Sequence, residues 1–197
     1  MVESKKDKRI RFFLIFCFAS LVMVGFYYQS KQTSTYIKEP HPMAVVIKEG
    51  SASGDNPYVG IYDYRDQKHL LALYEIEQNN FFHFKTLKAT ALKESPEQLA
   101  NDASGNGLWV RVSGIWHYFN PNLEIIERDE KYRISKDKLN YSVHTSEEGN
   151  VVTISDSKKI VVERNEVVYG VHSLSNDSTV WLLMTDKGAK ISIIETK

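Results

Sequence analysis

The feature that most constrains this chain is an apolar run over residues 12–28, which contains no charged side chain. As an α-helix, these seventeen residues would span about 25 Å, close to the roughly 30 Å of a hydrocarbon core. Five Lys or Arg residues and two acidic residues precede the run, within residues 1–11. The sequence therefore predicts a transmembrane helix over residues 12–28 and a short cytoplasmic tail over residues 1–11.

The charge distribution also predicts an orientation. The positive-inside rule places the N-terminus in the cytoplasm and everything after residue 28 outside. A cleaved signal peptide is the alternative, but its apolar region usually covers about 7–15 residues and ends at small side chains. Here the run ends with Phe26, Tyr27 and Tyr28. We therefore expect a single-pass protein of the cell membrane, held in the lipid bilayer by residues 12–28, with secretion after signal cleavage as the alternative.

The chain has one cysteine, Cys17, so no disulfide bond can form within it. Cys17 is interpreted as a small apolar side chain of the span, because Leu14, Ile15 and Phe16 before it are too large for a lipid-attachment site. An exported domain without disulfides has to rely on packing. This composition favours a bacterial protein over one from a eukaryotic secretory pathway.

Residues 29–42 are polar, with prolines near their end, and are predicted to be a tether. Residues 43–197 then form one extracytoplasmic domain, long enough to bury a core. Without residues 1–11 the chain has 20 Lys/Arg and 23 Asp/Glu, a net charge of −3. We expect no nucleic-acid partner, because a weakly acidic domain has no electrostatic attraction to phosphate backbones.

From residue 43 onward, short runs of β-branched and aromatic residues alternate with turn signals. Strands that recur about every 8–12 residues are typical of antiparallel all-β proteins. The predicted fold is an all-β antiparallel meander that forms a β-sandwich or an open barrel. Propeller-like blades are the alternative, although a domain of this length holds only three or four blades of about 40 residues.

One short helix is predicted near residues 96–103. Ser95, Pro96 and Gln98 match the N-cap, N1 and N3 positions of a capping box. The helix should end before Gly105, which leaves about two turns.

Catalytic and metal-binding patterns are scarce. The six histidines form neither an HExxH motif nor an i, i+4 pair. Two S-x-x-K matches, Ser135–Lys138 and Ser155–Lys158, lie in β-rich, turn-like sequence, whereas the chemistry needs the serine at a helix start. We therefore expect no catalytic residue, no metal ligand and no cofactor.

The aromatic residues suggest one candidate site. In a strand, Trp116 and Tyr118 share one face, while His117 and Phe119 share the other. Core packing explains such residues in one interpretation. In the other, Trp109, Trp116 and Tyr118 form a ligand platform for a sugar or a peptide.

The leading hypothesis is a membrane-tethered, non-enzymatic interaction or sensing module with an envelope protein or glycan as partner. One alternative is an exported hydrolase acting on cell-envelope material. Its carboxylates would have to be brought together by the fold, because no spacing in the sequence selects a pair. The other alternative is a structural subunit of a membrane assembly, which would expose a large apolar patch when isolated.

Overall fold

The computed structural model describes Ser20, Met23 and residues 40–51, 54–78, 81–134, 141–147, 149–155 and 158–194. The chain divides into two units, Met1–Glu39 and Pro40–Lys197. In the first unit Ser20 and Met23 are helical. The rest of the predicted tail and span, and the tether up to residue 39, lie outside the described residues. Within the part of the chain that the structure describes, no helix has the length and apolar character needed to cross a membrane.

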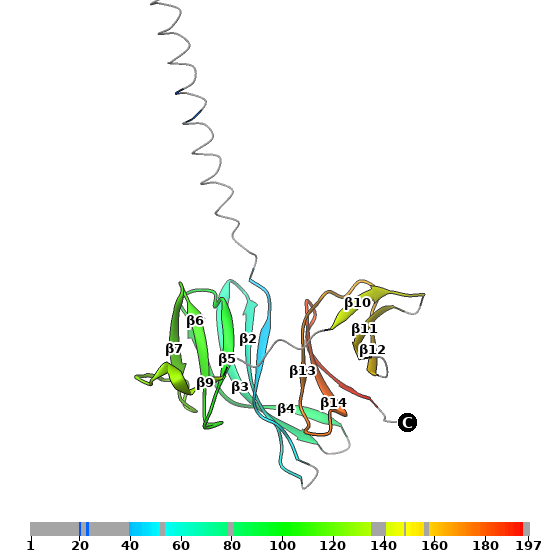
Figure 1. Cartoon of the computed structure of the whole chain (residues 1–197), viewed down its shortest axis with the longest axis horizontal. Coiled ribbons are helices and arrows are strands. Elements are labelled where there is room, and N and C mark those ends of the chain that lie inside the picture. The colour runs from blue at the N-terminus through cyan, green and yellow to red at the C-terminus, as the bar shows by residue number, and fades with distance from the viewer. Residues whose placement is uncertain are drawn as a thin grey trace, which may run out of the picture. The chain divides into compact units, whose positions relative to one another are not determined.

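The second unit is built from antiparallel strands, which confirms the all-β prediction (Figure 1). In chain order the strands are β1 (Met43–Lys48), β2 (Tyr58–Arg65), β3 (Lys68–Gln78), β4 (Phe82–Leu92), β5 (Gln98–Asp102), β6 (Leu108–Val112), β7 (Ile115–Phe119), β8 (Ile125–Ile126), β9 (Arg133–Ile134), β10 (Ser142–Thr145), β11 (Asn150–Ser155), β12 (Lys158–Val162), β13 (Val168–Ser173), β14 (Val180–Thr185) and β15 (Gly188–Ile193).

These strands form four sheets, which we number along the chain. The first sheet has the order β1-β2-β3-β4, and the second has the order β8-β7-β6-β5-β9. The third sheet is β10-β11-β12, and the fourth is β13-β14-β15. Within each sheet, strands that follow each other in sequence pair with each other, except that β9 pairs with β5, so the chain is a succession of meanders.

The first sheet is covered on both faces. Val59 and Ile61 of β2 pack in one hydrophobic cluster with Leu182 of the fourth sheet. Tyr62 of β2 packs in a second cluster with Leu108 of the second sheet. Successive residues of β2 thus point into two different cores, which explains why Val59–Tyr62 is a continuous buried run rather than an alternating one.

The fourth sheet is also covered on both faces. Trp181 and Leu183 point away from the first sheet and pack against Val152 and Ile160 of the third sheet. The face-to-face packing order is therefore second, first, fourth and third sheet.

The first sheet is strongly curved. β3 and β4 are 11 residues long, and their register shifts between Leu73 and Tyr74. Such a β-bulge bends a strand and increases its twist. In Figure 1 the long hairpin of β3 and β4 sweeps round as a curled half-barrel.

The prediction of a helix near residues 96–103 is wrong. Gln98–Asp102 is strand β5, and the Glu97 backbone N–H already donates to the Arg111 carbonyl at 2.8 Å. The hydroxyl of Ser95 does not cap a helix but lies 3.2 Å from the hydroxyl of Tyr62. An isolated two-turn helix is marginal, whereas pairing with β6 gives the same residues a complete ladder and a buried face.

Candidate functional site: an arginine-capped aromatic face

The three aromatic residues singled out in the sequence lie on one face of the second sheet. Trp109 and Tyr118 are directly opposite each other in the ladder, and their ring centroids are 5.3 Å apart. Trp116 packs against the same cluster, which also contains Ala100. This face is opposite to the one that Phe119 presents to the first sheet. We call it the outer face of the second sheet.

The outer face is covered by the chain itself. Residues 128–134, which we call the cap, contain the short 3₁₀ helix η1 (Glu130–Tyr132) followed by β9. The Arg128 guanidinium carbon lies 4.8 Å from the Tyr118 ring centroid and 4.7 Å from that of Tyr132. The Arg133 guanidinium lies 4.3 Å from the Trp116 ring centroid. Cation–π contacts therefore hold the cap on the aromatic rings.

A buried carboxylate anchors the cap. Arg128 donates from Nε to Asp102 Oδ1 and from Nη2 to Asp102 Oδ2, both at 2.8 Å. Trp109 Nε1 donates to Oδ1 at 3.1 Å, and the Ser104 backbone N–H donates to Oδ2 at 2.9 Å. The Ser104 hydroxyl also donates to Oδ2. Burial alone would raise the pKa of Asp102, but the hydrogen bonds from Ser104, Arg128 and Trp109 outweigh it and lower the pKa.

This arrangement limits what the face can do. Trp109 is 1% exposed and Tyr118 is 4% exposed, so neither ring offers an open surface for stacking a ligand. Trp116 is partly exposed, but Arg133 lies over its ring. Asp102 is ionised, and both of its carboxylate oxygens already accept hydrogen bonds from the protein, which suits a structural anchor. It does not suit a group that exchanges protons at neutral pH.

Sequence reasoning identified the aromatic residues but missed Asp102, Arg128 and Arg133. Asp102 fell within the wrongly predicted helix, and no role was predicted for Arg128 or Arg133. No spacing in the sequence links Arg128 to Asp102, which is 26 residues away. The only available signal was the combination of arginine and tyrosine in residues 128–133, which suits cation–π contacts.

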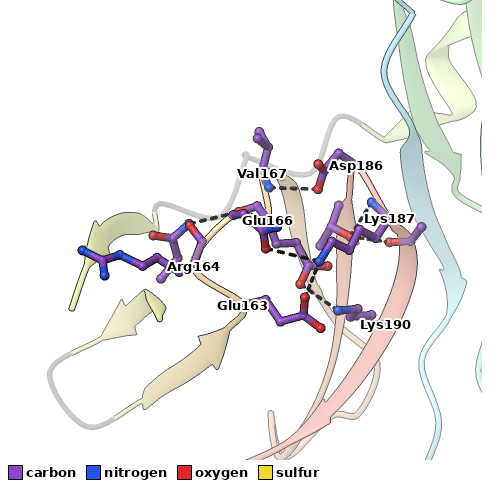
Figure 2. A network of polar contacts seen from close by, with 11 residues as sticks. Glu163, Arg164, Glu166, Val167, Asp186, Lys187 and Lys190 are labelled. Carbon is purple, nitrogen blue, oxygen red and sulfur yellow. Dashed lines mark hydrogen bonds and ion pairs between the residues drawn. The ribbon is translucent and has the colours of Figure 1, made fainter. Parts of the chain in front are cut away.

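A second polar network joins the third and fourth sheets (Figure 2). Glu166 is 1% exposed, and its Oε2 accepts a hydrogen bond from Lys190 Nζ at 2.7 Å. Asp186 Oδ1 accepts from the Val167 backbone N–H at 2.9 Å. Lys187 Nζ pairs with Glu163, which directly follows β12. These contacts fasten the connection between β12 and β13 to the β14–β15 hairpin.

The charge of Glu166 is maintained by its partner. Burial alone would raise its pKa, but the contacts with Lys190 and Thr185, together with the positive charges of Lys190 and Lys187, outweigh burial, so the pKa is lowered. Its Oε1 is buried and accepts no hydrogen bond from any side chain or backbone group that the structure describes. The hydroxyl of the adjacent Thr185 donates to the Gly188 carbonyl at 2.9 Å.

The histidines are dispersed. Among the described residues, no group of three or more His, Cys, Asp or Glu side chains could hold a metal ion. His69 Nδ1 lies 2.7 Å from the hydroxyl of the buried Tyr62. His172 on β13 lies opposite Leu182 in the ladder, and burial lowers its pKa to about 4.

Neither S-x-x-K match is seen in the helical setting that the catalytic motif needs. Ser155 ends β11 and Lys158 begins β12, so this pair spans a hairpin rather than one turn of a helix. Lys158 Nζ donates to the Ser178 carbonyl at 3.2 Å. The pair Ser135–Lys138 lies outside the described residues.

Comparison of the chain with protein-family models, with curated proteins and with solved structures finds no match.

Proposed function

We propose that this chain is a membrane-tethered, extracytoplasmic β-domain that acts as a non-enzymatic interaction or sensing module. Residues 12–28 hold it in the bilayer, and residues 43–197 are presented outside. The apolar run and the basic residues before it support the anchor and its orientation. A chain with one cysteine supports a bacterial envelope protein.

The observation that carries this proposal is the composition of the exposed margin of the cap and the outer face. Tyr132 of the cap is 41% exposed, and Ile126, which is opposite Tyr118 in the ladder, is 45% exposed. Arg111 and Trp116, also opposite each other, are partly exposed. Tryptophan, tyrosine and arginine are the residues enriched at the energetic centres of protein interfaces.

Two arginine donors at this margin strengthen the proposal. Arg111 Nε and Arg133 Nε are buried, and neither donates a hydrogen bond to a described residue. Arg111 Nε lies 3.3 Å from Glu97 Oε2 as an ion pair, without hydrogen-bond geometry. Buried donors are nearly always paired in folded proteins, so the Arg133 Nε beside Trp116, which has no partner among the described residues, favours a surface completed by another molecule.

The covered rings favour a protein partner over a glycan. A sugar would need the free face of an aromatic ring, whereas Trp109 and Tyr118 are buried beneath the cap. The state of the two buried carboxylates favours a non-enzymatic role over a hydrolase. Asp102 and Glu166 are each ion-paired with a lowered pKa, so neither is suited to donate a proton at neutral pH.

The packing order supports a finer description of the fold, the propeller-like alternative. The first sheet packs on the second, the fourth on the first, and the third on the fourth. If the four sheets are arranged in a ring, the order second, first, fourth, third is the order of the sheets along the chain, read in the reverse direction. Sequential meanders that pack face to face in cyclic order are the blades of a propeller. The second and third sheets are the two ends of this series, so the ring would close between them.

The proposal is tested by extracting the full-length protein from its native membranes in mild detergent and identifying stoichiometric co-purifying proteins. We expect Ile126→Glu to abolish recovery of the partner. Ile193→Glu is the matched control, because Ile193 is also an exposed strand isoleucine, at 59%, but on the fourth sheet. Turnover of an envelope substrate by the purified chain, lost on one polar substitution, would establish the hydrolase instead.

A further inference from the structure

The loop between β5 and β6 has a glycine that the fold requires. A Cβ atom at residue 107 would lie 2.4 Å from the Phe119 carbonyl oxygen and 2.6 Å from the Tyr118 hydroxyl. Both atoms belong to β7 and its buried core, so they cannot move aside at little cost. Only glycine fits at residue 107, because it has no Cβ.

The residue before this glycine is an asparagine with a free side chain. Asn106 is exposed, and its amide makes no hydrogen bond with any residue that the structure describes. It lies in a bend, and the ladder begins only at Leu108. Asn106–Gly107 is the one Asn-Gly pair in the whole sequence.

We propose that Asn106–Gly107 is a site of spontaneous covalent modification through a succinimide. The backbone nitrogen of Gly107 attacks Cγ of Asn106, a C–N bond forms, and the side-chain amide nitrogen leaves as ammonia with the proton from the Gly107 N–H. Water then opens the ring. Attack at Cγ gives aspartate, and attack at the main-chain carbonyl gives isoaspartate. The net reaction consumes one water and releases one ammonia, with no oxidant or enzyme.

Glycine makes this reaction fast, because it has no side chain to hinder the approach of its nitrogen to Cγ of the asparagine. The protein core imposes glycine at residue 107, while the solvent-exposed loop leaves the Asn106 amide unrestrained. The fold therefore brings together the two conditions that the reaction needs.

The modification would act on the anchor of the cap. The same loop holds the cap through the Ala103 backbone N–H, which donates to the Tyr132 carbonyl at 2.7 Å. It also holds Asp102 through Ser104. Aspartate adds a negative charge to this loop, and isoaspartate adds one carbon atom to its backbone. Either product changes the support of Tyr132 and Arg128, so the arginine–aromatic face would change as the protein ages.

The test uses the full-length protein in detergent, incubated in mildly alkaline buffer and sampled over time by peptide mapping and mass spectrometry. We expect the peptide containing Asn106 to gain the mass of an amide-to-acid change, and to resolve into aspartate and isoaspartate forms. Asn122 is the internal control, because it is also exposed in a turn next to the second sheet but precedes Leu123. The Asn106 peptide should convert several times faster than the Asn122 peptide.

Asn106→Gln should remove the product and leave the Asn122 peptide unchanged. Equal conversion of the two peptides would overturn the proposal. So would conversion of Asn106 only in urea-unfolded protein, because the folded loop would then protect the site.

Discussion

Arg128 and Asp102 form a two-point ion pair beneath the surface of the second sheet, with both donor–acceptor distances at 2.8 Å. The Asp102 side chain is fully buried, and Arg128 is 26% exposed. The two residues come from different elements, and their contact closes the cap over Trp109 and Tyr118. The outer face is therefore a small, self-covered core with a polar anchor at its centre.

Replacement of Arg128 should be costly. Arg128→Met leaves Asp102 as a buried carboxylate without its cation, which costs about 3–5 kcal/mol in comparable cases. We expect urea unfolding of the full-length protein in detergent to show a loss of this size, with an increase in tryptophan exposure.

Lys131→Met is the control for that substitution. Lys131 belongs to the same cap but is 65% exposed, and its partner Asp129 is 55% exposed. Exposed pairs contribute about 0–1 kcal/mol. Equal losses for the two variants would show that the Arg128–Asp102 pair does not anchor the cap.

His172 predicts a pH dependence of stability. Burial lowers its pKa from 6.5 to about 4. The unfolded chain therefore binds more protons than the native protein between these values, so the free energy of unfolding falls as the pH is lowered from 6.5 towards 4. The full effect is about 3 kcal/mol. His172→Phe should flatten this part of the stability curve, measured by urea unfolding at several pH values.

The exposed His144 on β10 provides the comparison. His144→Phe should leave the slope between pH 6.5 and 4 as in the parent protein. If the free energy of unfolding depends on pH in the same way after His172→Phe, groups other than His172 cause that dependence.

Lys190 should matter more than Lys187, although both pair with a glutamate. Lys190→Met strands the fully buried Glu166, whereas Lys187→Met leaves Glu163 with 63% of its side chain exposed. We expect Lys190→Met to destabilise by a few kcal/mol and Lys187→Met by less than about 1 kcal/mol. Hydrogen exchange should speed up at Glu166 and Val167 in the first variant only.

Glu166 also predicts acid sensitivity. Its pKa is lowered from 4.5 in the folded protein, so its contribution is present above that value and is lost as the pH falls through the folded pKa. This loss lies below most of the pH range over which His172 acts. Glu166→Gln should reduce the acid-induced loss in that lower range. If the parent protein and Glu166→Gln lose the same free energy there, the carboxylate is not the cause.

The proposed orientation can be measured with thiol labelling. In a Cys17→Ala background, Lys88→Cys places a thiol on the exposed part of β4, and Ser4→Cys places one in the N-terminal tail. A membrane-impermeant maleimide applied to intact cells should label residue 88 and spare residue 4. Labelling of residue 4 but not of residue 88 would show that the N-terminus is outside and the β-domain inside.

The all-β class was predictable because turn signals and β-branched runs are local features. The helix near residues 96–103 failed because Ser95, Pro96 and Gln98 carry a good local capping signal that pairing with β6 overrides. The aromatic residues of the second sheet were found from their residue type and, for Trp116 and Tyr118, from the alternation of side chains along a strand. The sequence could not show that they are covered, because Arg128 reaches them through a contact between distant segments.

The sequence by itself determined the apolar run, the antiparallel strand pattern, and the shared face of Trp116 and Tyr118. Each of these depends only on residue type and on a local pattern, which is either a continuous run or a repeat every two residues. Only the tertiary structure decided that both faces of the first sheet are buried, and that Asp102 and Arg128 meet. Those outcomes depend on which sheets pack together and on burial that lets a charge pair form, and neither is encoded in any one stretch of the chain.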